Sequence, residues 1–456
     1  MRINKIFLLL FFLVSLLSCQ KKRTFSNENI FLDSLSKHTF HYFWDLAGPE
    51  NGLIPDRWPT PSFASIAATG FGLSSYLVGV ERGYITRKEA AGRVLKTLRF
   101  FQNAPMGNNS SDVSGNHGFF YHFLDMQAGL RFRQVELSTI DTGLLIAGVL
   151  SCQTYFDGEN ENEKEIRSLA DCLYRSVEWD WAMNEKKTLS MGWHPEHGFI
   201  EASWKGYNEG MILYIMGLSS PTHPLPQNSW KSWTETYQWG EFYGQEHVNF
   251  GPLFGHQYSQ MYIDFNGIKD EFMRSKGIDY FENSRRATYA NRAYCILNPG
   301  GWVGYSENNW GLTACDGPGN ESNSNPNISF AGYNARGAGQ WYTQDDGTIS
   351  PTAAGGSLPF APEICIPALQ NMYQQYGSKI YSKYGFRDAF NLTILNADGS
   401  KGWYDVDYIG IDQGPILIQI ENYRNGFLWE LMKKNPYIKQ GLKNAGFEGE
   451  WLKEIK

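Results

Sequence analysis

Long hydrophobic runs are almost absent from this chain of 456 residues. The one extended apolar stretch runs from Ile6 to Leu17 and contains only Ser15 as a polar residue. It is shorter than the roughly 20 residues that a bilayer-spanning helix needs. No later segment approaches that length, so the sequence predicts no membrane-spanning helix.

Cysteine is scarce, and its spacing excludes common cysteine-based sites. Beyond Cys19 there are five cysteines without any CxxC pair, so neither a zinc site nor a disulfide framework is expected. Cys152 and Cys172 could pair if they lay on neighbouring antiparallel helices. His194 to His197 superficially suggests a metal motif, but Pro195 is incompatible with an HExxH helix. We therefore expect no metal.

Concentrated positive charge is also missing. The net charge is −7, from 40 basic and 47 acidic residues, and no dense basic run follows the first 30 residues. Nucleic acid is therefore excluded as an expected partner. No GxSxG elbow, Walker loop or helix-opening GxGxxG is present, so no cofactor is expected either.

The N-terminus carries the pattern of a bacterial lipoprotein. Arg2 and Lys5 precede the apolar stretch, which ends at a lipobox-type cysteine, Cys19. We predict a signal peptide at 1–18, lipidation of Cys19, a flexible tether over 19–30 and one catalytic domain over 31–456. The tether is basic rather than acidic, which favours a periplasm-facing anchor in the cell envelope. Membrane contact would then be through the lipid alone, and we expect a monomer.

Aromatic residues are abundant, at 15% of the chain. Several lie in segments rich in Gly and Asn, including Trp302, Trp310 and the pair Trp341-Tyr342. Flat rings at a cleft can stack on the apolar faces of pyranose sugars, although anchoring of loops is an equally ordinary role. The aromatic content therefore favours a carbohydrate-binding cleft.

Helical periodicity dominates the remaining sequence. We predict a chain of helical hairpins whose long polar loops gather at one mouth, an all-α (α/α)6 toroid with small β-hairpins. Residues 302–359, rich in glycine, are expected to cap the cleft. The predicted helices span 29–46, 62–83, 86–101, 138–156, 163–181, 207–218, 253–265, 277–297, 362–376 and 414–434, with a shorter one at 381–390 and hairpins at 118–133 and 191–203.

Hydrolysis of a glycosidic bond needs two carboxyl groups, one protonated and one ionised. Glu209 lies between aromatic and glycine residues at the head of an apolar helix, where desolvation would tune its pKa. Asp141 begins a helix, but Ser138 also makes it part of an acidic capping box. A second carboxylate is expected from Asp412 or from its upstream neighbours Asp405 and Asp407.

Several blocks in the same order resemble one enzyme family. They are 136–143 (ELSTIDTG), 204–210 (WKGYNEG), 254–259 (FGHQYS), 361–363 with 367–369, and 408–415 with 421–424. The chain from about residue 31 to its end is similar to the bacterial glucoamylase-like proteins, most of all to glycoside hydrolase family 144, the endo-β-1,2-glucanases. The resemblance implies an (α/α)6 barrel, no metal, and endo-cleavage of β-1,2-glucan to sophorooligosaccharides with inversion.

The resemblance also implies roles for individual residues. Glu209 matches the family's general acid, and Asp412 is the expected base, with Asp141 as the other important acid. A substrate hydroxyl can relay the proton in such enzymes, so the base may stand farther away than the ~6.5–9.5 Å usual for inverting pairs. We expect substrate contacts from Asp45, Arg57, Glu136, Trp204, Tyr207, His256, Gln257, Asn309, Trp310, Glu363 and Asp405.

Three other functions fit parts of the sequence. A lipid-anchored glycan-binding protein would bind sugar without releasing reducing ends. A polysaccharide lyase on the same barrel would use residues such as Arg57, His256 and Tyr258. An enzyme of the same fold could also act on another glucan linkage or transfer glycosyl units.

Overall fold

The computed structural model describes residues 28–319, 328–396 and 398–453. The expected signal peptide, Cys19 and nearly all of the tether lie outside these residues. Among the described residues, none of the helices combines the length and apolar character that crossing a membrane requires.

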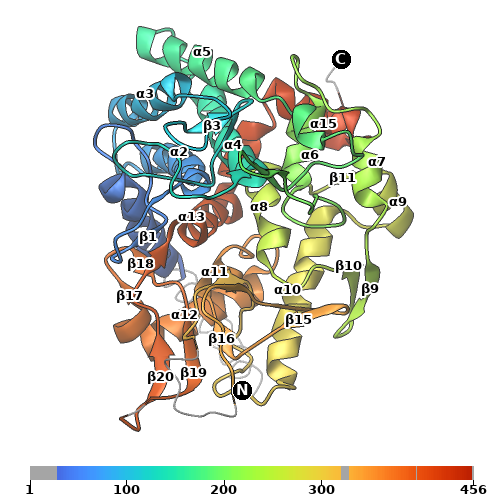
Figure 1. The fold of residues 1–456 in the computed structure, drawn as a ribbon. Coiled ribbons are helices and arrows are strands. Elements are labelled where there is room, and N and C mark those ends of the chain that lie inside the picture. The colour runs from blue at the N-terminus through green and yellow to red at the C-terminus, as the bar shows by residue number, and fades with distance from the viewer. Residues whose placement is uncertain (1–27, 320–327, 397, 454–456) are drawn as a thin grey trace, which may run out of the picture.

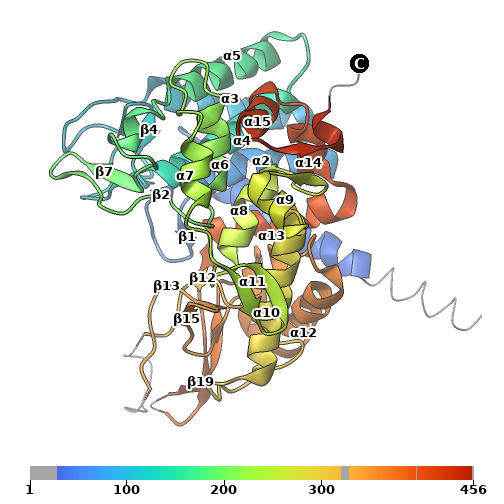
Figure 2. The same cartoon turned by 90° about the vertical axis from the view of Figure 1, so that its right-hand side faces the viewer.

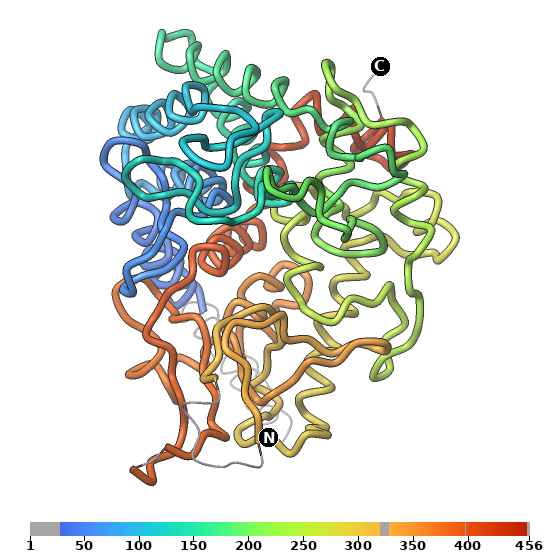
Figure 3. Tube along the Cα trace, viewed as in Figure 1, coloured from blue at the N-terminus to red at the C-terminus, as the bar shows by residue number. Residues whose placement is uncertain are grey.

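Six helices form an inner ring, which the chain follows in order (Figures 1 and 3). Almost every residue of these helices is buried, polar side chains included. The last packs against the first and closes the ring. The inner helices are α2 (Ile66–Glu81), α4 (Thr139–Tyr155), α6 (Met211–Leu218), α8 (Phe254–Tyr262), α11 (Pro351–Gly355) and α13 (Gly410–Asn425).

Amphipathic helices surround this ring and complete the predicted (α/α)6 toroid. The helix predicted at 86–101 begins with a capping box: Thr86 Oγ1 accepts from the Glu89 amide, and the Glu89 carboxylate accepts from the Thr86 amide. The outer helices are a helix over 28–46, α3 (Arg87–Asn103), α5 (Glu161–Ser176), α7 (Ser229–Thr234), α9 (Glu271–Lys276), α10 (Tyr280–Leu297), α12 (Pro362–Ile380), α14 (Phe427–Met432) and α15 (Pro436–Asn444).

Short strands gather where the inner helices begin, as Figure 2 shows for β2, β4, β7, β13 and β15. Strands β2 (Ala64–Ser65), β6 (Leu137–Ser138) and β21 (Tyr408–Ile409) run directly into α2, α4 and α13, and β16 (Thr348–Ile349) ends one residue before α11. Strand β1 (Arg57–Trp58) pairs antiparallel with β21, Arg57 opposite Ile409, and joins the two ends of the ring. This end of the barrel is its mouth.

The other strands form two- or three-stranded antiparallel pieces. They are β3 (Gly115–Asn116), β4 (Phe119–Phe120), β5 (Phe123–Leu124), β7 (Gly192–His194), β8 (Gly198–Phe199), β9 (Trp239–Phe242), β10 (Gln245–Val248), β11 (Ile268–Lys269), β12 (Ala314–Cys315), β13 (Asn334–Ala335), β14 (Gly337–Gly339), β15 (Tyr342–Gln344), β17 (Tyr381–Ser382), β18 (Gly385–Phe386), β19 (Phe390–Leu395), β20 (Lys401–Tyr404) and β22 (Glu448–Gly449). Single 3-10 turns cover Trp181–Met183 and Glu450–Leu452.

The structure corrects three local predictions. The expected hairpin at 191–203 is present as β7 and β8. The one at 118–133 is present only as a short turn in which Leu124 bridges Arg131 antiparallel, while β4 pairs with β3 and β5 pairs with β2. The predicted helix at 381–390 is instead the hairpin β17–β18, whose Gly385 has a φ of 87°. The predicted helix at 414–434 begins at Gly410 and divides at Gly426, where φ is 67°.

Glycine decides how closely the first two inner helices approach. A Cβ on Gly148 of α4 would lie 2.2 Å from the backbone oxygen of Gly70 in α2. A Cβ on Gly70 would meet the carbonyl of Leu144 at 2.5 Å. The helices therefore touch through their backbones. Cys152 on α4 and Cys172 on α5 are both free, so the disulfide considered from the sequence is not formed.

Candidate active site

Three acids predicted from the sequence come to the mouth of the barrel. Asp141 and Asp412 lie in the first turns of α4 and α13, and Glu209 lies two residues before α6. Burial raises the pKa of Tyr258 on α8, and the charges of Asp412, Glu209 and Asp141 raise it further. All three carboxyl groups therefore act on one tyrosine. The positive ends of inner helices favour carboxylates at this position.

Glu209 has the environment of a proton donor. The expected helix from 207 begins only at Met211, because the Asn208 side chain accepts a hydrogen bond from the Gly210 amide at 2.9 Å and forms a turn. The residue is partly exposed, but its Oε2 is buried without a hydrogen-bond partner among the described residues. Burial, with a smaller contribution from Asp141, raises the pKa of Glu209 to about 7. A carboxyl group of this kind carries a proton near neutral pH.

Asp141 belongs to a chain of charged groups. Its Oδ2 accepts a hydrogen bond from Ser138 Oγ at 2.5 Å and lies 3.5 Å from Nε2 of His122. The other ring nitrogen of His122 contacts Glu136 Oε1 at 2.8 Å. Burial lowers the pKa of His122, but Asp141, Glu136 and Asp56 outweigh it and raise the pKa to about 9. His122 is therefore a cation that holds two carboxylates in place.

Asp412 is paired with a second buried acid, Asp388. Their side chains share a hydrogen bond, and Asp388 also accepts from the Asp316 amide at 2.6 Å. Burial and the charge of Asp412 raise the pKa of Asp388 well above its usual value, so Asp388 holds the shared proton. Burial raises the pKa of Asp412 to about 7, while the hydrogen bond from Asp388 lowers it. Oδ2 of Asp412 is buried and has no partner among the described residues.

Arg57 lies at the centre of the remaining acids. It donates to Asp56 at 3.2 Å and to Asp316 at 2.6 Å, and lies 3.8 Å from Asp407. Burial and the charge of Asp316 raise the pKa of the neighbouring Asp405 to about 7. The expected substrate-binding residues Arg57 and Asp405 therefore lie with Asp412 on one side of the mouth.

One group of carboxylates has the spacing of a cation site. Asp316, Asp405 and Asp407 each offer an oxygen, and these oxygens lie within 4.8 Å of one another. The guanidinium of Arg57 already contacts two of the three, so its positive charge supplies what a metal ion would supply there. The absence of a metal requirement stays a prediction.

Four predicted substrate contacts are instead buried behind the mouth. Exposed fractions are 6% for Trp204, 5% for Tyr207 and 1% for both His256 and Gln257. The Trp204 indole donates to Thr139 Oγ1 at 2.8 Å, and Tyr207 stacks on Tyr280. His256 Nε2 contacts the carbonyl oxygen of Phe250 at 3.0 Å, and Gln257 donates to Ala353 and Ser357 of the α11 region. Trp204, His256 and Gln257 therefore position the loops rather than face sugar, whereas Tyr207 also lines a cavity of the mouth.

Three further residues that we expected to contact the substrate lie away from the mouth. Asn309 and Trp310 are 1% and 0% exposed, and Trp310 packs in the hydrophobic core. Glu363 begins the outer helix α12, where it accepts from Arg285 at 2.5 Å and from Tyr289. Its charge acts on Tyr423 in the last turn of α13, at the end opposite Asp412.

Asp45 lies on the outer helix over 28–46. It pairs with His41 at 3.1 Å and with Lys383 at 3.0 Å. Lys383 is exposed and His41 partly so, and neither pairing joins Asp45 to the acids of the mouth.

Sequence reasoning missed several residues of the site. Asp388, Asp316, Asp56 and His122 occur in segments without a recognisable motif, and only the fold brings them beside Asp412 and Asp141. The predicted cap over 302–359 supplies Asp316 and also Tyr333, half of which is exposed. Burial and the charge of Asp412 raise the pKa of Tyr333.

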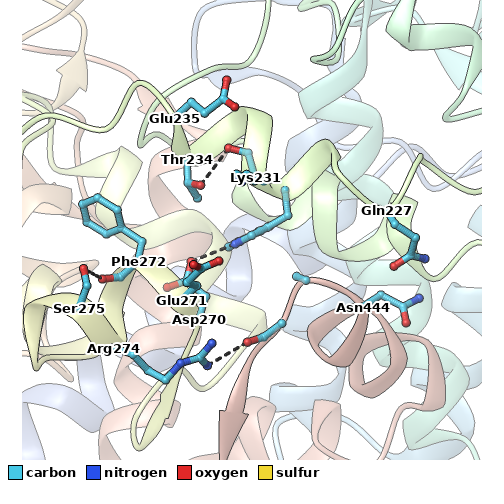
Figure 4. A pocket seen from close by; sticks show the side chains of 13 residues that line it. Gln227, Lys231, Thr234, Glu235, Asp270, Glu271, Phe272, Arg274, Ser275 and Asn444 are labelled. Carbon is cyan, nitrogen blue, oxygen red and sulfur yellow. Dashed lines mark hydrogen bonds between the residues drawn. The ribbon is translucent and has the colours of Figure 1, made fainter.

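Two cavities differ in their relation to these acids. A cavity of about 510 Å³ lies between α7, α9 and α15 on the outside of the ring, where Arg274 donates to the Gly446 carbonyl at 3.0 Å (Figure 4). It contains none of the acids of the mouth. Another, of about 460 Å³, is lined by Asn208, the residue before Glu209, and by Tyr342 of β15.

Comparisons with known proteins agree with the barrel fold. A model of the Glycoamylase family, described as "putative glucoamylase", matches residues 201–436. The structure of a "putative glucoamylase" from Bacteroides uniformis is 34% identical, with a TM-score of 0.81, over 93% of this chain and 99% of that one. An endo-β-1,2-glucanase from Chitinophaga pinensis is 32% identical, with a TM-score of 0.80, over 93% and 99%.

A longer relative matches as well. An exo β-1,2-glucooligosaccharide sophorohydrolase (non-reducing end) from Parabacteroides distasonis is 32% identical over 445 residues. The match covers 90% of this chain but only 57% of that protein.

The barrel, the acids at the N-terminal ends of its inner helices and the likeness to these relatives together identify a glycoside hydrolase. The chain belongs to the Glycoamylase family and, within it, to glycoside hydrolase family 144, which confirms the resemblance drawn from the sequence.

Proposed function

We propose that the protein hydrolyses β-1,2-glucan internally and releases sophorooligosaccharides. The observation that carries the proposal is Glu209, a protonated acid facing the mouth with a buried oxygen that lacks a partner. The named activities of the Chitinophaga and Parabacteroides relatives support β-1,2-linked glucose as the substrate.

In the proposed reaction Glu209 gives its proton to the glycosidic oxygen as the bond to the anomeric carbon breaks. Water attacks that carbon from the opposite face, and Asp412 takes the proton of the water, directly or through a substrate hydroxyl. The anomeric configuration is thereby inverted. Asp141 lies between Ser138 and His122, where its charge helps to keep Glu209 protonated.

The binding of sugar hydroxyl groups is assigned to the acids around Arg57. Asp405 and Asp412 each have an oxygen that is buried without a partner among the described residues. Such oxygens are costly to leave unpaired and are satisfied when hydroxyl groups donate to them. No cofactor is needed for this chemistry.

The alternatives are less well supported. A lyase would require Arg57, His256 and Tyr258 to converge, yet His256 is buried against the Phe250 carbonyl, and burial lowers its pKa to about 3. A glycan-binding protein has no use for a carboxyl group held protonated. Release of sophorose from chain ends, as the name of the Parabacteroides relative indicates, differs from internal cleavage in its products.

A panel of linear glucans tests the proposal. The wild-type protein should convert β-1,2-glucan first to a range of sophorooligosaccharides, with the inverted anomer released. Glu209→Gln should lower kcat by at least about 100-fold, because no neighbouring group replaces a lost proton donor, while the unfolding midpoint is preserved. Sophorose as the sole early product would contradict internal cleavage, and an active Glu209→Gln would contradict the acid.

We also propose that Cys19 carries the lipid anchor and that the catalytic domain acts as a monomer on the periplasmic side of the envelope. The lipobox-type sequence and the basic tether support this location.

A further inference from the structure

The cavity lined by Asn208, which we name the Tyr342 pocket, is bounded by several segments of the mouth. They are the turn before α6, the stretch between α7 and β9, the stretch that leads from β10 to α8, and the strands β13 and β15. Its volume of about 460 Å³ lies in the range of roughly 300–1,000 Å³ that ligand pockets occupy. Its lining residues are Lys205, Gly206, Tyr207, Asn208, Thr236, Gln238, Asn249, Phe250, Gly251, Pro252, Ala335 and Tyr342.

Tyr342 is fixed in a position suited to stacking. Its hydroxyl donates to the Ala335 carbonyl at 2.7 Å, and 44% of the residue stays exposed. The ring lies against Gly251, where a Cβ would come within 2.5 Å of it. The Tyr342 ring can occupy this position because Gly251 has no side chain. An exposed ring held in one orientation loses little entropy when a sugar face packs on it.

Polar groups hold the other walls. Asn249 donates to the carbonyls of Gly240 and His247 at 2.9 and 3.0 Å and accepts from the Gln340 amide at 3.1 Å. It thus ties the hairpin β14–β15 to the rest of the mouth. The exposed Lys205 and Gln238 add donors and an acceptor at the rim. Together with one ring, such groups suit a neutral, hydroxylated ligand.

We propose that the Tyr342 pocket binds glucose units of the glucan on the leaving-group side of the scissile bond. This inference rests on the proposed function. The proton of Glu209 goes to the oxygen that departs with the leaving sugar, so that sugar lies on the side of Glu209. Asn208, the residue before Glu209, lines the pocket, and the lining contains none of the acids grouped with Arg57 and Asp412.

Binding can be measured without turnover in the Glu209→Gln protein. Calorimetric titration with β-1,2-linked oligosaccharides of increasing length should show about tenfold weaker binding of the longer ones when Tyr342→Ala is added, as for loss of a well-packed ring. Gly251→Ala should give a similar loss, because its new Cβ displaces the ring without removing it. Trp341→Ala is the matched control, since this exposed neighbour does not line the pocket.

Turnover of oligosaccharides labelled at the reducing end locates the pocket relative to the cut. Tyr342→Ala in the active protein should raise KM more than it lowers kcat and shift cleavage so that labelled products become shorter. Unchanged binding and products in both Tyr342→Ala and Gly251→Ala would overturn the pocket, while wild-type cleavage still upheld the proposed function. A wild-type protein that binds glucan through Tyr342 but does not cleave it would refute the reaction and leave the pocket as a glucan site.

Discussion

Asp388 illustrates how one side chain can set the state of another. It is 2% exposed, accepts from the Asp316 amide and shares a hydrogen bond with Asp412. Because it is the protonated member of the pair, it donates to Asp412 and leaves that group as the carboxylate. An asparagine amide has the same pattern, with an oxygen to accept and an NH₂ to donate.

Asp388→Asn should therefore keep most of the activity, whereas Asp388→Ala should lose it. The alanine variant removes the donor that positions Asp412 and leaves a buried carboxylate unsatisfied, at a cost of about 1–3 kcal/mol, or roughly 5- to 150-fold in kcat. Steady-state kinetics of the two variants on β-1,2-glucan, with unfolding midpoints, check this. An asparagine variant as inactive as the alanine variant would show that Asp388 must ionise.

The pH dependence of hydrolysis should follow the ionisation of Glu209 and Asp412. Glu209 must be protonated, and its pKa of about 7 means that kcat/KM falls above neutral pH, by up to about tenfold per pH unit. Asp412 must be ionised, and its pKa of about 7 makes the rate fall below neutral pH. A narrow bell-shaped profile measured on soluble glucan is expected. A broad plateau that extends into alkaline conditions would contradict the assignment of Glu209.

Among the elements, the inner helices supply both the acids and the rigidity of the site. Tyr258 of α8 shows how they are joined: its hydroxyl contacts the Ile411 carbonyl of α13 at 3.4 Å. That carbonyl has no amide partner at position 415, because residue 415 is proline. A proline within the helix thus frees an acceptor for the tyrosine that stands among the three acids.

The backbone contact between α2 and α4 gives a test of stability. Gly148→Ala adds a Cβ 2.2 Å from the Gly70 oxygen, and the resulting overpacking should lower the free energy of unfolding by at least about 1–3 kcal/mol. Gly92→Ala is the control, because this exposed glycine of α3 has no atom within 4 Å of the added Cβ and should gain helix stability. Urea unfolding of both variants measures the difference, and equal stabilities would contradict the close contact.

For the whole molecule, the proposed anchor determines where the barrel meets its substrate. Cys19→Ser should move the protein from the membrane fraction to the soluble fraction, because the lipid is the proposed membrane contact. Fractionation of cells that express each form measures the change, with glucan hydrolysis in the lysate as the control for folding. A variant that stays in the membrane fraction would contradict the anchor at Cys19.

The sequence by itself determined the helical toroid, the glycoside hydrolase family and the segments that carry Glu209, Asp141 and Asp412. These follow from local information: apolar periodicity, capping residues such as Thr86 and Ser138, and short blocks in a fixed order. The predicted helix boundaries were wrong where a single glycine or asparagine redirected the backbone, as at Gly426 and Asn208.

Only the tertiary structure decided which polar and aromatic residues face the mouth. In the sequence, Trp204 and Trp310 resemble exposed rings that bind sugar, yet both side chains are buried. Glu363 lies at the far end of the barrel. Conversely, Asp388 carries no local signal, but burial and the charge of Asp412 raise its pKa. Burial and charge coupling depend on residues that are distant along the chain, so they arise only when the ring of helices closes.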